Sequence, residues 1–417
     1  MLLASPRLSQ QASAATGLVV AAVCHNRALL SRNAASGAVL LIIPFTTVLA
    51  FATLYLPQPI LPLLAQEFGV AETDAALLTA VAMAPLGIAP ILYGYLADQI
   101  SAKRVLRVAV ALLAVNELLL ALVPGFWSML GLRLVQGLVL PAVFTSLITY
   151  SANTAGPGRV RNAVNLYIGA TIIGGFSGRF VGGFVSEYLH WRAAFGLLAL
   201  LLALAWLALG GLRGDTRPKL DQMGSSALRE ALRRPVNRNA YVGIFLVFFV
   251  FASVLNYLPF RLKSLDPMML ESTISLVYVG YLSGALIALN GVRIARWLGG
   301  ELRGIFLGLL LLAAGVTGMM TTSLAQVFFF VLLMCAGFFL IHSLLTAFLN
   351  HHAVSGKGVV NGLYISFYYS GGALGGWLPG YVYRGAGWEP YLSVLVALLA
   401  VAGWWLWRMR VASNELT

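Results

Sequence analysis

The amino-acid sequence predicts an all-α integral membrane protein with twelve transmembrane helices, arranged as two pseudo-symmetric six-helix halves. Three observations support this prediction: the apolar composition, the number of long apolar segments, and a repeat that relates the two halves. Of the 417 residues, 60% are hydrophobic and 10% are charged, whereas soluble domains average roughly 45–50% apolar and 25% charged residues. The composition therefore excludes a water-soluble globular protein.

Long continuous apolar runs, such as Ala194 to Leu209 and Val327 to Leu349, favour membrane helices over a β-barrel, whose strands are short alternating segments. Turn residues between such runs divide the chain into twelve expected spans: 38–63, 76–97, 105–123, 126–150, 164–188, 191–212, 240–260, 273–295, 304–324, 327–349, 359–383 and 390–407. An even number of spans places both termini on the same side of the membrane.

The Lys and Arg residues are distributed unequally between the two sides. Most of the 27 lie in the tails and in connections on the side of the termini, whereas Arg192, Arg261, Lys263 and Arg384 lie on the opposite side. By the positive-inside rule, both termini are expected in the cytoplasm. The net charge of +13 is therefore interpreted as a topology signal, and no nucleic-acid partner is expected.

The expected domain organisation follows from these spans. It comprises a flexible cytoplasmic tail over 1–37, an N-terminal half over 38–212, a basic cytoplasmic linker over 213–239, a C-terminal half over 240–407 and a cytoplasmic tail over 408–417. The tail over 1–37 has a poor signal peptide as its alternative interpretation. The basic residues of the linker are interpreted as an anchor that fixes the topology. Binding of anionic lipid headgroups is the alternative interpretation.

A repeat relates the fifth and eleventh spans. At an offset of 197 residues, as from Gly174 to Gly371, the second copy repeats four glycines, the Leu-Tyr-Ile sequence and a tryptophan, Trp191 and Trp388. Duplicated six-helix halves are typical of transporters that bind substrate near the middle of the membrane, where the repeats meet.

The connection after the second span carries a recognisable motif. Its pattern resembles the signature between helices 2 and 3 of the major facilitator superfamily, G-x-L-A-D-x-x-G-x-K/R-R, and Ser101 replaces its second glycine. The resemblance implies a gating motif formed by Gly94, Asp98, Lys103 and Arg104. A glycine permits close helix approach, and an aspartate at a helix end accepts charge-assisted hydrogen bonds.

The fourth span contains Arg133 within a sequence similar to the family pattern R-x-x-Q-G. An arginine inside a membrane needs a polar partner. Glu117 and Arg133 are each eight positions from Gly125 in the intervening turn, so both are expected at a similar depth. A pair that carries and releases a proton and a static buried pair are both compatible with this spacing.

The fifth span contains Gly174 to Gly183, which resembles the antiporter-associated motif G-x-x-x-G-P-x-x-G-G, with Arg179 in place of the proline. Small residues at intervals of four predict close helix packing, here by Gly174, Gly178, Gly182, Gly371 and Gly375. The arginine predicts a role in substrate binding or gating, with a structural tie to a neighbouring helix as the alternative.

Other polar residues within the spans complete the candidate site. The candidates for the substrate cavity are Tyr55, Gln58, Asn256, Tyr257, Tyr364 and Tyr368, and His342 is a candidate for proton coupling with Glu117 and Arg133. Helix packing is the alternative role for each of these residues. Ser177 lies in a G-x-S-G sequence typical of intramembrane serine proteases, but the glycine pattern and the repeat favour a transporter, so we expect no enzyme activity.

Taken together, the chain after residue 37 resembles a bacterial major facilitator superfamily permease, and segments such as Gln58 to Pro62 and Ser177 to Arg179 resemble its YnfM-like efflux branch. The resemblance implies alternating access in the inner membrane. No nucleotide-binding loop is present, so an ion gradient is expected to drive transport.

The leading hypothesis is proton-coupled export of a small organic or amphipathic compound by a monomer. The alternatives are proton symport of a small organic anion or metabolite, and a membrane sensor that does not transport. The expected partners are the small-molecule substrate, protons and the lipid bilayer. No cofactor and no metal are expected, since the two cysteines are too few for a metal cluster or a disulfide framework.

Overall fold

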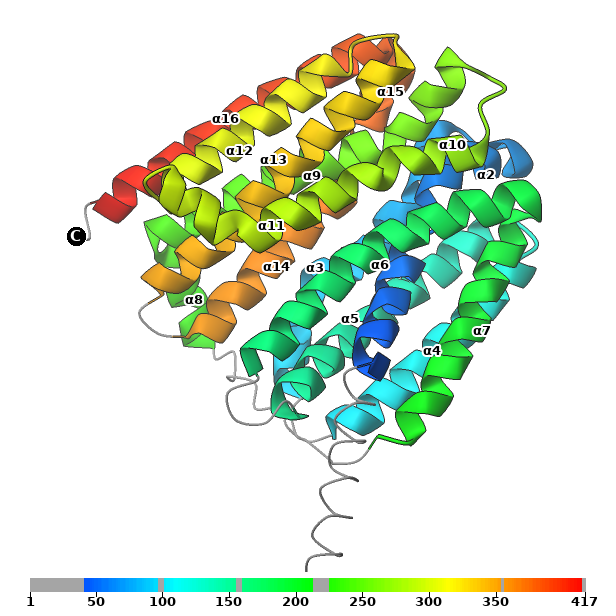
Figure 1. Cartoon of the computed structure of the whole chain (residues 1–417), viewed down its shortest axis with the longest axis horizontal. Helices are drawn as coiled ribbons and strands as arrows, with labels where there is room; N and C mark the ends of the chain where they lie inside the picture. The colour runs from blue at the N-terminus through cyan, green and yellow to red at the C-terminus, as the bar shows by residue number, and fades with distance from the viewer. Residues whose placement is uncertain (1–40, 97–100, 155–159, 213–224, 354–355, 415–417) are drawn as a thin grey trace, which may run out of the picture.

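The computed structural model describes residues 41–96, 101–154, 160–212, 225–353 and 356–414 (Figure 1). The expected tail over 1–37 lies outside the described residues, as do Asp98 and residues 213–224 of the expected linker. The described residues fold into long helices that form two adjacent groups, one blue to green and the other green to red in Figure 1.

The first group begins with a helical segment over residues 41–55, which ends in a turn before Gln58. Its other members are η1 (Gln58–Ile60), α2 (Leu61–Phe68), α3 (Glu72–Leu96), α4 (Ala102–Leu122), α5 (Phe126–Thr154), α6 (Val160–Tyr188) and α7 (Trp191–Gly210). Within the group, α4 packs on α5 and α7, and α3 packs on α5.

The second group begins with the short helix α8 (Ser225–Arg233). Its other members are α9 (Pro235–Leu265), α10 (Glu271–Leu276), η2 (Val277–Val279), α11 (Gly280–Trp297), α12 (Glu301–Gly318), α13 (Leu324–His352), α14 (Lys357–Gly375), α15 (Gly380–Ala386) and α16 (Trp388–Asn414). Within this group, α9 packs on α14 and α16, and α13 packs on α11 and α12.

The membrane helices agree with the predicted spans, with one difference. In the described part of the chain, eleven helices are long and apolar enough to cross a membrane. The remaining expected span, 359–383, is divided between α14 and α15. The glycines in this segment disfavour a continuous helix. Pro379 also lacks the backbone N–H that would continue the hydrogen bonding of α14.

The helix boundaries refine the expected linker and C-terminal tail. The second half of the expected linker is helical, because α8 covers Ser225–Arg233 and α9 begins at Pro235. Proline is favoured at the first position of a helix, where its missing N–H needs no partner. The segment over 408–417, expected as a tail, continues α16 as far as Asn414.

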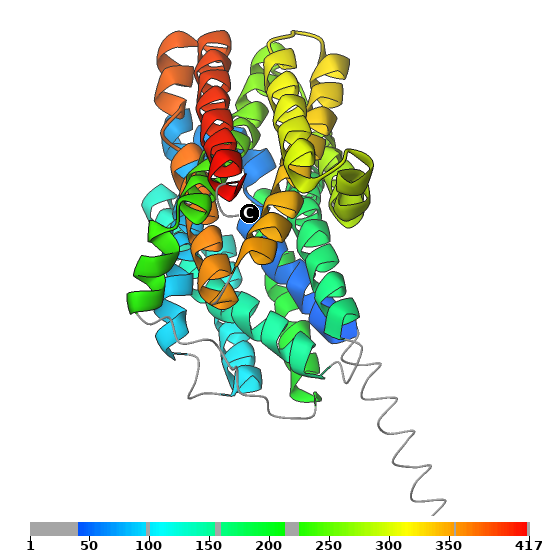
Figure 2. The same cartoon turned by 90° about the vertical axis from the view of Figure 1, so that its left-hand side faces the viewer.

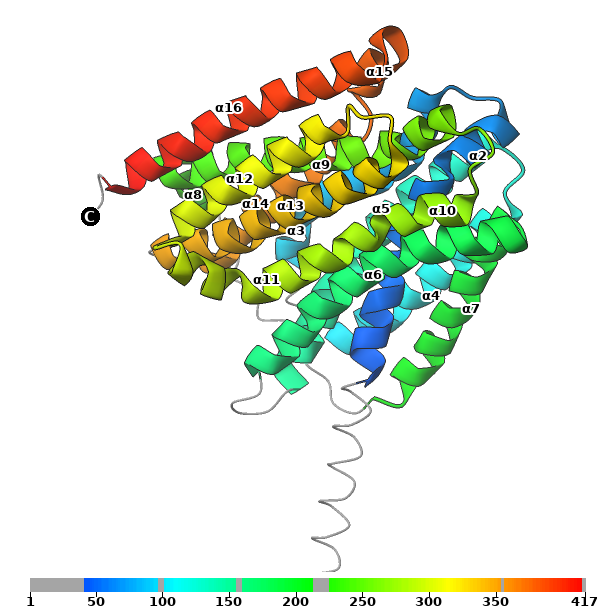
Figure 3. The same ribbon diagram turned by 45° about the horizontal axis from the view of Figure 1, so that its top comes forward.

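The two groups meet along α3, α6, α9, α11 and α14. We call the end of the bundle where α2 ends and α3 begins the far end, and the end that holds Leu41 and Asn414 the near end. Helix α3 packs on α14, while α10 and α11 pack on α6 (Figure 3). The helices α15 and α16 meet at the far end, at the top of Figure 2.

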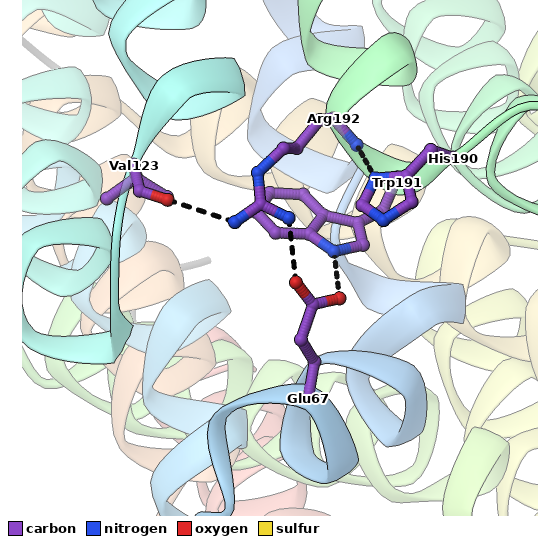
Figure 4. A network of polar contacts seen from close by, with 5 residues as sticks. All are labelled: Glu67, Val123, His190, Trp191 and Arg192. Atoms are coloured by element: carbon purple, nitrogen blue, oxygen red, sulfur yellow. Dashed lines mark hydrogen bonds and ion pairs between the residues drawn. The ribbon is translucent and has the colours of Figure 1, made fainter.

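A polar network ties three elements of the first group together at the far end (Figure 4). The Glu67 carboxylate at the end of α2 accepts hydrogen bonds from the Trp191 indole and from the Arg192 guanidinium, the latter at 2.7 Å. Arg192 also donates to the carbonyl of Val123 at 3.2 Å, just after α4. The start of α7 is thereby fixed to both neighbouring helix ends.

Glycines set the closest helix contacts in both groups. A Cβ atom built on Gly178 would lie 2.3 Å from the Ala52 carbonyl oxygen, and one on Gly375 would lie 2.1 Å from the Phe249 carbonyl oxygen. Gly174, Gly182 and Gly371 face backbone oxygens at 2.2 to 2.6 Å in the same way. Helix α6 therefore contacts the first helical segment as α14 contacts α9, in agreement with the internal repeat.

We expect Gly178→Ala to destabilise the protein, because the added methyl group meets backbone atoms of the first helical segment. Overpacking of this kind typically costs about 1–3 kcal/mol. The measurement is the Tm of the purified protein in detergent. Gly169→Ala on the same helix is the matched control, since its Cβ meets nothing within 4 Å; it should leave Tm unchanged or raise it. Equal Tm values for the two variants would contradict the expectation.

Candidate functional site

Arg179 on α6 is at the centre of the contact between the two groups. Its side chain is buried, with 1% exposure, and its Nε donates a hydrogen bond to Gln58 Oε1 at 2.5 Å. The two terminal nitrogens donate to the Gly175 carbonyl at 2.7 Å and to the Tyr281 hydroxyl at 3.0 Å. The guanidinium thus connects η1 and α6 of the first group with α11 of the second.

Three tyrosine rings surround the same guanidinium. The Arg179 Cζ atom lies 4.0 Å from the ring centroid of Tyr55, 4.2 Å from that of Tyr281 and 5.1 Å from that of Tyr278. A desolvated cation–π contact is worth about 2 kcal/mol or more. The ion pairs of the described residues do not include Arg179. Ring faces and oxygen dipoles therefore stabilise this buried charge in place of a carboxylate.

A chain of amide side chains continues from Arg179 into the second group. Gln58 Nε2 donates to Asn256 Oδ1 at 2.6 Å, and Asn256 Nδ2 donates to the Gly376 carbonyl at 2.9 Å and to the Ala76 carbonyl at 3.4 Å. Gln58 and Asn256 are each 1% exposed. The chain links η1 and α3 with α9 and with the break between α14 and α15.

The sequence explains why this chain forms. Pro57 lacks a backbone N–H, so the first helix stops and the 3-10 turn η1 turns Gln58 toward α6 and α9. On the opposite side, a Cβ atom at Gly376 would lie 2.9 Å from the Asn256 amide nitrogen. Only glycine leaves room there for the amide to reach the carbonyl. By the repeat, position 376 is the counterpart of Arg179.

Arg133 and Glu117 are fully buried and are joined through Gln136. The Gln136 amide donates to Glu117 and accepts from Arg133. Arg133 also donates to the carbonyls of Thr53 at 2.9 Å and of Leu54 and Leu78, each at 2.7 Å. The geometry differs from the expected direct pair because the guanidinium is used by backbone carbonyls, including that of Thr53, which Pro57 leaves without a helical partner.

Glu117 keeps one oxygen without a partner. Its Oε2 atom is buried and has no hydrogen bond among the described residues. A buried carboxyl group with a free oxygen leaves room for a proton to be held or released. The same static geometry also fits a buried polar cluster that ties four helices together: the first helical segment, α3, α4 and α5.

His342 on α13 forms a separate cluster with tyrosines of α14. Its Nδ1 lies 2.9 Å from the Tyr364 hydroxyl, and its ring centroid lies 5.0 Å from that of Tyr368. The Tyr368 ring in turn stacks on Phe248 at 3.8 Å. This cluster connects α9, α13 and α14 within the second group, and these contacts do not include Arg179.

Tyr257 packs at the break between α14 and α15. Its hydroxyl donates to the Trp377 carbonyl at 3.0 Å, and its ring lies 5.5 Å from that of Tyr383. A Cβ atom on Gly380 would lie 1.9 Å from the Tyr257 hydroxyl oxygen. Tyr257 therefore lies next to Asn256 of the polar chain in the sequence, but its hydroxyl is hydrogen-bonded to the Trp377 carbonyl in the break between α14 and α15.

The connection between α3 and α4 uses its serine as a helix cap. Ser101 Oγ accepts a hydrogen bond from the Arg104 N–H at 3.4 Å and so caps the start of α4. The Lys103 amine donates to the carbonyl of Leu212 and, at 3.4 Å, to that of Gly210. Lys103 therefore satisfies carbonyls at the end of α7; Gly94 lies in α3, and Asp98 is outside the described residues.

Sequence reasoning missed several partners of these residues. Tyr278 and Tyr281 contact Arg179 from a segment without any recognised motif, and Ser275 donates to the Arg179 carbonyl at 3.0 Å. A tyrosine in an apolar span carries no signal of its direction without a tertiary structure. Gln136 belongs to the R-x-x-Q-G pattern of the fourth span, which marks it as a polar residue but does not show that its amide bridges Arg133 and Glu117.

Comparisons with known proteins agree on the family. The model of the Major Facilitator Superfamily matches residues 44–376. The chain is 29% identical over 366 residues to the inner membrane transport protein YnfM of Escherichia coli (strain K12), covering 84% of this chain and 85% of YnfM. It is 27% identical over 365 residues to the uncharacterized MFS-type transporter YybF of Bacillus subtilis (strain 168), covering 85% and 89%.

The fold agrees with a solved transporter structure. A bacterial homolog of the human lysosomal transporter Spinster, in an inward-facing and unoccupied conformation, superposes with a TM-score of 0.73 at 16% identity, covering 91% of this chain and 98% of that chain. The resemblance stated from the motifs is thereby confirmed, and the multi-pass helical architecture with it. The chain is a membrane transporter and belongs to the Major Facilitator Superfamily.

Proposed function

We propose that this transporter exports a small organic or amphipathic compound in exchange for protons, by alternating access between the two groups of helices. The observation that carries the proposal is the buried chain from Arg179 through Gln58 and Asn256 to Gly376. It joins the groups through the hydrogen bond between Gln58 and Asn256, which breaks when the groups move apart. We assign the chain the role of a far-end gate.

The topology belongs to the same proposal. The near end, with both termini, faces the cytoplasm of a bacterial inner membrane, as the distribution of Lys and Arg favours. Residues 38–212 and 240–407 then act as the two moving halves, with the protein working as a monomer. In this orientation, the described gate closes the external side, and cargo enters from the cytoplasm.

The composition around Arg179 supports an organic cargo. Tyrosines offer apolar area together with a hydroxyl group, which suits amphipathic molecules. When the gate opens, Arg179 loses the hydrogen bond to the Tyr281 hydroxyl of the second group and gains a free donor for a carbonyl or anionic group. Tyr55 is a proposed cavity residue on this basis, and Tyr364 and Tyr368, in the separate cluster around His342, are proposed cavity residues because of the same side-chain chemistry.

Glu117 is proposed to carry the exchanged proton. Its carboxyl group is linked through Gln136 to Arg133. Arg133 in turn donates to carbonyls of the first helix just before Pro57, and Pro57 precedes the gate residue Gln58. Protonation of Glu117 weakens its attraction for Arg133, and the resulting shift reaches the first helix directly. His342 is a second proposed proton carrier, through its contact with Tyr364.

Uptake of an organic anion with protons is the second candidate. The observation that favours it is the buried Arg179 cation, which is not among the ion pairs of the described residues. An anion bound there would neutralise the charge. The sign of the proton flux distinguishes the candidates, because antiport acidifies the compartment that cargo leaves and symport acidifies the compartment it enters.

We expect Arg179→Lys to lower transport by at least about tenfold, since lysine keeps the charge but loses the planar set of donors, and each charge-assisted hydrogen bond is worth about 1.5–3 kcal/mol. The measurement is proton flux in pyranine-loaded proteoliposomes on addition of ethidium, benzoate and related amphiphiles. Arg293→Lys, at an exposed position, is the matched control and should retain flux. Undiminished flux in Arg179→Lys would show that Arg179 is not part of the gate.

We expect Glu117→Gln to abolish cargo-dependent proton movement, because a glutamine side chain neither binds nor releases a proton at the pH values at which the protein is folded. Binding of cargo should persist, as the amide preserves the size of the side chain and its contact with Gln136. The exposed Glu230→Gln on α8 serves as control. Normal proton flux in Glu117→Gln would show that the coupling proton is carried elsewhere.

A further inference from the structure

A polar cavity lies at the far end between the two groups of helices, away from Arg179. Its volume is about 590 Å³, and Glu72 at the start of α3 lines it from the first group. From the second group, the lining includes Arg261 and Ser264 near the end of α9, Tyr383 and Arg384 of α15, and Trp388 at the start of α16. We call it the outer pocket.

Two cations line the outer pocket and form no ion pair among the described residues, and the charge of one of them, Arg384, acts on Glu72 in the same lining. Four basic residues were expected on this side of the membrane, and two of them form ion pairs: Arg192 with Glu67 at 2.7 Å and Lys263 with Glu271 at 2.9 Å. Arg261 and Arg384, the other two, are absent from the ion pairs of the described residues and both line the outer pocket.

The environment of Arg261 supports a bound anion. Its Nε atom is buried and has no hydrogen-bond partner in the described part of the chain, and leaving a buried donor unpaired is unfavourable. Its guanidinium lies 5.9 Å from the Trp388 ring centroid. An incoming carboxylate would satisfy this donor.

Apolar ring surface adjoins the two cations. Trp388 is held by a hydrogen bond from its indole to the Met319 carbonyl at 2.7 Å, and its ring lies 5.8 Å from that of Tyr383. The pocket also lies at the N-terminal ends of α3 and α16, where helix dipoles favour negative charge. Glu72 is the one acidic residue in the lining, so two arginines outnumber it.

We propose that the outer pocket binds a small organic carboxylate with an aromatic or apolar body. The carboxylate bridges Arg261 and Arg384, and the body lies against Tyr383 and Trp388. This site is separate from the Arg179 gate and does not depend on the direction of transport. Because both groups of helices line it, a bound ligand there would respond to their relative movement.

The test is calorimetric titration of benzoate into the full-length protein in nanodiscs of neutral lipid. We expect Arg261→Gln and Arg384→Gln each to weaken benzoate binding by tenfold or more. Glu72→Gln should strengthen it, because a like charge is removed. Lys263→Gln is the matched control: it removes one positive charge two residues from Arg261, where the amine is engaged by Glu271 and the Met269 carbonyl, and should change affinity less than twofold.

Three outcomes would overturn the proposal. The first is the absence of benzoate binding to the unmodified protein, and the second is unchanged affinity in both arginine variants, which would locate the bound benzoate elsewhere. The third is loss of benzoate binding when phosphatidylglycerol is added to the nanodiscs, which would assign the pocket to a lipid headgroup. Benzylamine, with the same ring and the opposite charge, should not bind. Since Arg384 is exposed, its variant tests the proposal even where Arg261→Gln fails to fold.

Discussion

The fold depends on satisfying backbone groups where helices break inside an apolar bundle. A carbonyl without a partner costs several kcal/mol in a membrane, and the breaks at Pro57 and after Gly375 create such carbonyls in both groups. Arg133 donates to the carbonyls beside the first break, and Asn256 donates to the Gly376 carbonyl at the second. Asn256, which bonds to Gln58 across the contact between the two groups, thus also satisfies a carbonyl at one of the breaks.

The repeat explains both the similarity of the groups and their difference. Glycines of α6 and of α14 approach the neighbouring helix backbones in the same manner. At the position of Arg179, however, the second copy has Gly376, and there α14 ends while α6 continues. One copy therefore supplies a cation and the other a free carbonyl, and Gln58 and Asn256 connect them.

Much of the architecture was predictable from the sequence, because apolar length and glycine spacing are local signals. Eleven helices and the packing of Gly178 follow from them directly. The candidate site was only partly predictable: Arg179, Gln58 and Asn256 stand out as polar residues in apolar spans, but nothing local indicates that they contact one another. Tyr281 and Gln136 required the tertiary structure, since the direction of a side chain around a helix axis is set by its neighbours. The bridged arrangement of Glu117 and Arg133 was unpredictable because the carbonyls freed by Pro57 compete for the guanidinium.

The tyrosine enclosure of Arg179 has a consequence for the response of the protein to its solvent. In the described state the guanidinium is dry, and separating the groups would wet it together with the amides of Gln58 and Asn256. In the proposed movement the two states of this site differ in hydration, so osmolytes that are excluded from protein surfaces favour the dry state and hydrostatic pressure favours the wet one. Water activity becomes a control variable for this transporter alongside any gradient across the membrane.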